Sequence, residues 1–156
     1  MKQSNGQSYS PSNGMCIICK DQNNGSNNIL ENLDHLIFYC PNSNRIWSTI
    51  QVLLSRFSNK TIVVDNIVAT TGLWQNGVSN ECLLMNTICS ITRFHIWKVR
   101  CKIRYGQEVV DFNSNVGLLT SRLRNHMNNL LSSHSDNTTI VNDVNRLIDL
   151  INNLSF

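Results

Sequence analysis

The sequence of 156 residues has little charge, few aromatic side chains and almost no proline. Charged residues make up 15% of it and aromatic residues 7%, and there are two prolines. The low aromatic content predicts an aliphatic core, in one domain or in a small module joined to a helical one. The net charge of +3 is too small to indicate, by itself, what the protein binds.

Features of membrane and secreted proteins are missing from the sequence. No apolar run approaches the roughly 20 residues that a membrane-spanning helix needs. The first residues, Met1-Lys2-Gln3-Ser4, do not begin a secretion signal. We therefore expect an intracellular protein, in the nucleus or the cytoplasm, without membrane contact. In that setting its six cysteines would be reduced, and a disulfide framework is not expected.

Patterns typical of catalysis are missing as well. The sequence contains no Gly-flanked nucleophile and no glycine-rich loop for a phosphate. Its ten acidic residues are scattered singly, whereas a nuclease holds its metals between clustered carboxylates. We expect a protein that is not an enzyme. A metalloenzyme is the alternative, in which Asp34 polarises a water on a metal that keeps an open position.

Four potential metal ligands lie near the start of the chain. Cys16 and Cys19 are separated by two residues, and His35 and Cys40 by four. Three thiolates and one imidazole are the ligands of a closed, tetrahedral structural Zn²⁺ site. A thioredoxin-like redox pair is the alternative for the first two cysteines. Such a pair follows a strand and begins a helix, whereas Asn- and Gly-rich sequence flanks this one.

The second ligand pair sets a condition on the backbone. Residues five apart on an α-helix lie about 140° apart around its axis. His35 and Cys40 can therefore converge only if a helix beginning near Glu31 ends or bends before Pro41. The proline favours such an end, because the residue before it avoids the α conformation.

These residues resemble a known family, the zinc-binding domain near the C terminus of reverse transcriptases from non-LTR (LINE-type) retrotransposons. Its pattern has a Cys pair, a variable loop, an acidic residue four before a histidine, an apolar run, Cys-Pro, and an Arg near a Trp. The matching residues are Cys16, Cys19, Glu31, His35, Leu36, Phe38, Cys40, Pro41, Arg45 and Trp47. The strong part of the resemblance covers residues 15–57. A weaker similarity at residues 94–100 extends it to about residue 105.

The resemblance implies a noncatalytic module of a longer polyprotein. Such a module would hold element RNA or target DNA for the neighbouring reverse transcriptase domain, and the start of this chain would be an arbitrary cut. The second hypothesis is a protein-interaction module in which zinc only joins helices, without affinity for nucleic acid. Neither hypothesis fixes the preference for RNA or DNA, or the oligomeric state.

The rest of the chain shows helical periodicity, so the predicted fold is all-α. It comprises a disordered leader (1–14), a Cys-Cys-His-Cys zinc loop with the first helices (15–57) and a helical domain (58–156), with about four to five helices in the bundle. Ser43 is the predicted cap of a helix that runs to about residue 57. Trp47 on that helix is interpreted as a core residue, with base stacking as the alternative. Asp65 can cap one further helical turn.

A long central helix is predicted over about 79–105, capped by Ser79 and stopped by Gly106. Its apolar face contains Cys89 and His95, a small core residue and a core or edge histidine. A C-terminal helical hairpin follows, with Asn113 or Ser114 opening its first helix and residues 136–138 its second. A coiled-coil seam that forms a dimer is the alternative for this hairpin.

The central helix also carries a candidate nucleic-acid surface. On a helical wheel Arg93, Arg100 and Arg104 fall within about 40° of one another, with Trp97 on the adjoining edge. Arginines beside an aromatic residue can bind phosphates and stack on exposed bases. The alternative is a solvated helix face whose cations interact with the helix dipole.

Overall fold

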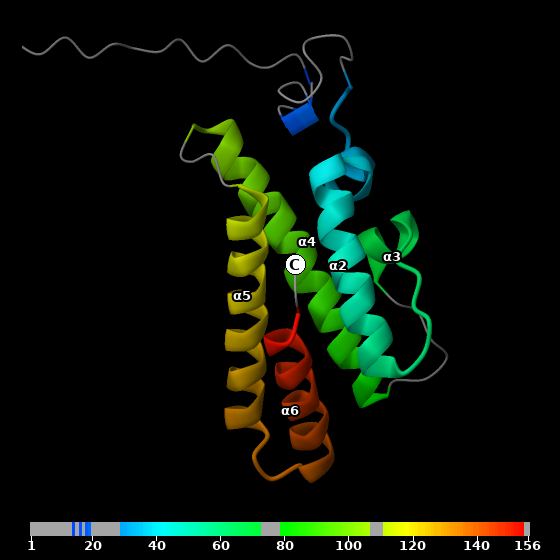
Figure 1. The fold of residues 1–156 in the computed structure, drawn as a ribbon, viewed down its shortest axis with the longest axis vertical. Helices are drawn as coiled ribbons and strands as arrows, with labels where there is room; N and C mark the ends of the chain where they lie inside the picture. Colours follow the sequence, from blue (N-terminus) through cyan, green and yellow to red (C-terminus); the bar gives the residue numbers. More distant parts are fainter. Residues whose placement is uncertain are drawn as a thin grey trace, which may run out of the picture.

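The computed structural model describes residues 14, 16, 18–19, 29–72, 79–106 and 111–154. The predicted leader lies outside these residues, apart from Gly14. The described chain has one π-helix, η1 (His35–Tyr39), and five α-helices (Figure 1). These are α2 (Pro41–Ser58), α3 (Asn66–Thr71), α4 (Asn80–Arg104), α5 (Phe112–Ser133) and α6 (Thr138–Asn152). The all-α prediction of a Cys/His segment followed by a helical bundle is confirmed.

α4 is the central helix, as the sequence predicted. The Ser79 hydroxyl accepts a hydrogen bond from the amide of Cys82 (3.1 Å) at its start. Gly106 follows its end with a φ of +67°, a left-handed conformation that glycine adopts without strain. α4 contacts each of the other described helices and passes behind α2 in Figure 1. It therefore connects the segment that contains η1 to the C-terminal helices.

One aliphatic core joins the helices. It runs from Ile37 in η1 to Ile151 in α6, and its buried aromatic residues are Trp47 and Phe57. Trp47 is 1% exposed, so its interpretation as a core residue is confirmed. The predicted division at residue 57 falls inside this continuous core, because α2 packs against both α4 and α6.

The start of α2 differs from the prediction. The helix begins at Pro41, and its N-cap is Cys40. Proline fits the first helical position because an N–H there would have no partner within the helix. Ser43 lies inside the first turn and is buried. Its hydroxyl donates a hydrogen bond to the carbonyl of Leu36 in η1 (2.7 Å). Ser43 therefore joins two helices and does not cap one.

The C-terminal helices form the predicted hairpin, with one cap displaced. Asp111 caps α5, and its carboxylate accepts hydrogen bonds from the amides of Asn113 and Ser114, the residues predicted as caps. Asn137 caps α6, inside the predicted range, through a hydrogen bond from the amide of Ile140 (3.2 Å). α5 and α6 lie side by side in Figure 1 and pack against each other. Asp65 caps α3 as predicted.

Candidate metal centre

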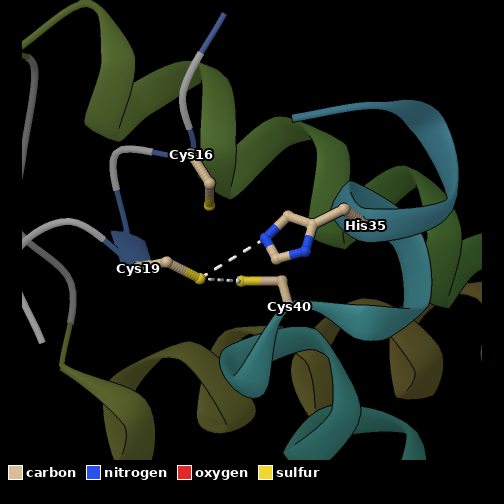
Figure 2. A group of neighbouring side chains, drawn as sticks. All are labelled: Cys16, Cys19, His35 and Cys40. Carbon is tan, nitrogen blue, oxygen red and sulfur yellow. Dashed lines mark hydrogen bonds between the residues drawn. The ribbon is translucent and has the colours of Figure 1, made fainter. Parts of the chain in front are cut away.

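The four predicted metal ligands meet in one buried cluster. The sulfurs of Cys16, Cys19 and Cys40 and a ring nitrogen of His35 all lie within 4.8 Å of one another. Figure 2 shows the four side chains turned toward a common point. His35 Nε2 is 3.4 Å from the Cys19 sulfur, and the sulfurs of Cys19 and Cys40 are 3.9 Å apart. We call these four residues the Cys₃His cluster.

These separations fit a tetrahedral metal site. Zinc–sulfur bonds of about 2.3 Å and zinc–nitrogen bonds of about 2.0 Å place two sulfurs about 3.8 Å apart and a sulfur and a nitrogen about 3.5 Å apart. A disulfide would instead bring two sulfurs to about 2.05 Å. None of the six cysteines, all of which lie in the described part of the chain, forms a disulfide. The cluster can therefore hold one metal ion with three sulfurs and one nitrogen.

Backbone hydrogen bonds bring the two halves of the cluster together. The amide of Cys16 donates to the carbonyl of Ile29 (3.0 Å), and the amide of Glu31 donates to the carbonyl of Gly14 (2.6 Å). These two bonds place the first cysteine beside the segment that leads into η1. The amide of His35 is fixed in turn by the side chain of Asn32, which accepts its hydrogen bond (2.7 Å).

A turn of π-helix aligns the second pair of ligands. The amide of Cys40 donates to the carbonyl of His35 (2.7 Å), which is the hydrogen bond between residues five apart that defines a π-helix. One turn of η1 therefore separates the two ligands, and both face the same side. Cys40 is then extended (φ −61°, ψ 129°), and α2 begins at Pro41. The prediction that the helix ends before the proline is confirmed, while the π-helix itself was not predicted.

α2 holds η1 in place through a buried hydrogen bond. The indole N–H of Trp47 donates to the carbonyl of Ile37 (2.7 Å). Together with the Ser43 hydroxyl bond described above, it satisfies carbonyls of η1 that have no partner within that short helix. The orientation of His35 and Cys40 therefore depends on α2.

The thiols of the Cys₃His cluster differ in their protonation. Hydrogen bonding to Cys40 and burial raise the pKa of the Cys16 thiol far above its ordinary value. The same hydrogen bond lowers the pKa of Cys40. Burial, and then the hydrogen bond with Cys16, raises the pKa of Cys19 to about 11. Cys16 and Cys19 therefore keep their protons in the metal-free cluster at neutral pH, and a metal ion must displace them.

An ion pair connects this segment to α4. Arg100 forms a salt bridge with Glu31, and the two side chains are 8% and 10% exposed. The Arg104 guanidinium also approaches the same carboxylate, with an Nη1–Oε1 distance of 4.0 Å. The residue just before η1 is therefore fixed to the C-terminal half of α4 by a largely buried charge pair.

The four residues predicted to bind nucleic acid lie in different surroundings. Arg100 is buried against Glu31, and the Arg93 guanidinium donates to the carbonyl of Ala69 (3.3 Å). The Arg104 side chain is 32% exposed, and Trp97 is 50% exposed. The packing of α3 and of the segment before η1 covers part of the helix face on which the wheel placed them.

A group of residues beside Trp97 was not predicted. An open cavity of about 450 Å³ lies between α4 and α5, and we call it the α4–α5 groove. Its lining residues are Ser90, Ile91, Phe94, Lys98, Arg122 and His126. The signal that could have indicated it is the absence of Asp and Glu from residues 82–107 and 112–135, in which α4 and α5 carry seven Lys and Arg.

Comparison with known proteins finds no match to a family model, a curated protein or a solved structure. The resemblance to the retrotransposon domain therefore stays a prediction from the sequence. Among the described helices, none combines the length and the apolar composition that crossing a membrane requires.

Proposed function

We propose that the chain is a noncatalytic, zinc-stapled module that binds nucleic acid, either RNA or DNA. In this proposal zinc fixes the segment before α2, and α4 and α5 supply the binding surface. The resemblance of residues 15–57 to the retrotransposon zinc-binding domain supports a role in which the module holds element RNA or target DNA for a neighbouring reverse transcriptase domain.

The ligand set of the Cys₃His cluster supports zinc and a structural role. Thiolates and imidazole are donors that suit Zn²⁺, whereas Mg²⁺ and Ca²⁺ prefer oxygen. Four protein ligands complete a tetrahedron, so no position is left for a reacting water or substrate. All four residues are also buried, as expected of a site that stabilises a fold.

The observation that carries the nucleic-acid proposal is the segregation of charge. Residues 82–107 contain five Lys and Arg, and residues 112–135 contain two Arg. Neither stretch contains an Asp or a Glu. These stretches form most of α4 and α5, which pack against each other. The net charge of +3 conceals this, because the rest of the chain has more acidic than basic residues. Glu31 offsets one of these charges, at Arg100, and the positive charge that remains on the two helices attracts a polyanion.

Fluorescence anisotropy with labelled RNA and DNA would test the proposal on the zinc-loaded chain. We expect affinity to fall linearly with salt on a logarithmic plot, with a slope of about −0.7 for each phosphate of a single strand that is contacted. The variant Lys98→Glu should weaken binding more than Lys60→Glu, which makes the same charge change at an exposed position after α2. No measurable affinity at moderate salt would contradict the proposal and favour the protein-interaction module.

A further inference from the structure

We infer that the α4–α5 groove, together with Trp97 beside it, is the contact surface for single-stranded nucleic acid, with an unpaired base on the Phe94–Trp97 pair and phosphates at Lys98 and Arg122. The inference rests on the proposed function and names the surface and the form of its ligand. Its two parts, the aromatic pair and the cations, come from different observations.

The aromatic pair is exposed in a way that the core aromatics are not. Phe94 is 53% exposed and Trp97 is 50% exposed, whereas Trp47 and Phe57 are almost fully buried. The rings of Phe94 and Trp97 lie one helical turn apart on α4, with centroids 5.9 Å apart and planes inclined by 33°. Neighbouring ring faces at a surface offer a platform on which a base can stack.

Two cations flank this platform. The Lys98 ammonium is 5.9 Å from the centroid of the Phe94 ring, and the Arg122 guanidinium carbon is 6.0 Å from it. Lys98 comes from α4 and Arg122 from α5, so the cations reach the ring from both helices. A strand whose base stacks at the aromatic pair would thus have positive charge near its backbone.

A buried histidine positions Arg122. His95 is fully buried, and its Nε2 is hydrogen-bonded to the side-chain oxygen of Asn115. Burial lowers the pKa of His95, so the ring is neutral at pH 7. Its Nε2–H then donates to Asn115, and its Nδ1 accepts a hydrogen bond from Arg122 Nη1 (3.2 Å). The guanidinium is therefore held at the wall of the groove before any ligand arrives, which lowers the entropy lost on binding.

The features of the groove favour a single strand over a duplex. In a duplex the base faces are covered by their neighbours, so a stacking platform recognises unpaired bases. The groove's volume of about 450 Å³ is within the range of about 300–1,000 Å³ found for ligand clefts. Its lining residues include no carboxylate that would repel a phosphate.

The test compares a short oligouridine with a duplex of the same length, using the zinc-loaded full chain. The double variant Phe94→Ala/Trp97→Ala should weaken binding of the single strand roughly 5- to 150-fold, the effect expected for losing one stacked base. Leu83→Ala is the matched control, because Leu83 is 51% exposed on the same helix but lies outside the groove. The variant Trp97→Tyr should retain most of the affinity. Zinc content and helical circular dichroism confirm that each variant is folded.

Different results separate the inference from the proposed function. If the chain binds nucleic acid but the double variant binds the oligouridine as tightly, the groove is not the contact surface. Tighter binding of the duplex would likewise overturn the inference and leave the proposed function standing. If the unaltered chain binds neither probe, the proposed function fails, and an acidic protein partner becomes the better explanation of the basic helices.

Discussion

The segment before α2 and the helices that follow are stabilised in different ways. The cluster at Cys16, Cys19 and Cys40 is separate from the main core and has only Ile18 as an apolar neighbour in the described chain. The core of the helices extends from η1 to α6. Of the first segment only η1 reaches that core, through Ile37 and its partly buried neighbours. Burial of so few apolar groups cannot offset the conformational entropy of ordering the residues before η1, whereas the helical core is much larger. We therefore expect that the first segment depends on metal and that α4, α5 and α6 do not.

Removing one metal ligand should have the largest effect on the difference between the two regions. Replacing Cys16, Cys19 or Cys40 with Ser should abolish zinc binding, which contributes about 10–16 kcal/mol in structural zinc peptides. Residues 29–40 should then lose hydrogen-exchange protection while α5 and α6 keep theirs. Cys101→Ser is the matched control, because Cys101 lies on α4 outside the cluster, and it should retain zinc. Unfolding of α5 and α6 together with the first segment would contradict the distinction between the two regions.

Breaking the ion pair between the two regions should have the next largest effect. Arg100→Met leaves the carboxylate of Glu31 largely buried without its main partner, at a cost of about 3–5 kcal/mol in the free energy of unfolding. The double variant Glu31→Gln/Arg100→Met should regain much of that loss, because neither charge is then left unpaired. Chemical denaturation measures both. If the effects of Arg100→Met and of Glu31→Gln alone add up to the effect of the double variant, the pair does not couple the two regions.

A cavity in the helical core should destabilise the helices and leave the metal site unchanged. Leu123 is fully buried on α5, and Leu123→Ala should lower the free energy of unfolding by about 2–5 kcal/mol. The zinc content of the folded protein should stay the same. Leu118→Ala on the same helix is the control, since Leu118 is 43% exposed and its loss should change stability by less than about 0.5 kcal/mol. Loss of zinc in the Leu123 variant would mean that the cluster depends on the distant core.

The pH dependence of metal affinity tests the cluster without any substitution. The raised pKa values of Cys16 and Cys19 mean that a metal must displace both protons near neutral pH. Affinity should therefore rise with pH by at least about 100-fold per unit and fall as the pH falls. Competition with a chelator across a pH series measures the slope. An affinity independent of pH would mean that the cysteines are already thiolates before the metal binds.

Local signals in the sequence were enough to predict much of the fold. Ser79 and Gly106 mark the ends of α4 because caps and left-handed glycines act through their own neighbours. The Cys₃His cluster could be predicted for a similar reason, because the two residues within each ligand pair lie close together in the sequence. Cys40 replaced Ser43 as the N-cap of α2 because the proline after it fits the first helical position.

One local hydrogen bond and two contacts between distant residues could not be predicted from such signals. Periodicity does not distinguish one π turn from an α turn, so the hydrogen bond that aligns His35 and Cys40 was not predicted. A helical wheel places Arg100 on a face but does not reveal that Glu31 covers it. The α4–α5 groove likewise depends on α5 lying beside Phe94, a packing that no local pattern contains.

X-ray absorption spectroscopy of the purified full chain tests the central claim most directly. Binding by the Cys₃His cluster predicts one zinc per chain, with three sulfurs at about 2.3 Å and one nitrogen at about 2.0 Å. A chain without metal, a disulfide between any two of the cluster's cysteines, or a zinc with oxygen in place of a sulfur would contradict the claim.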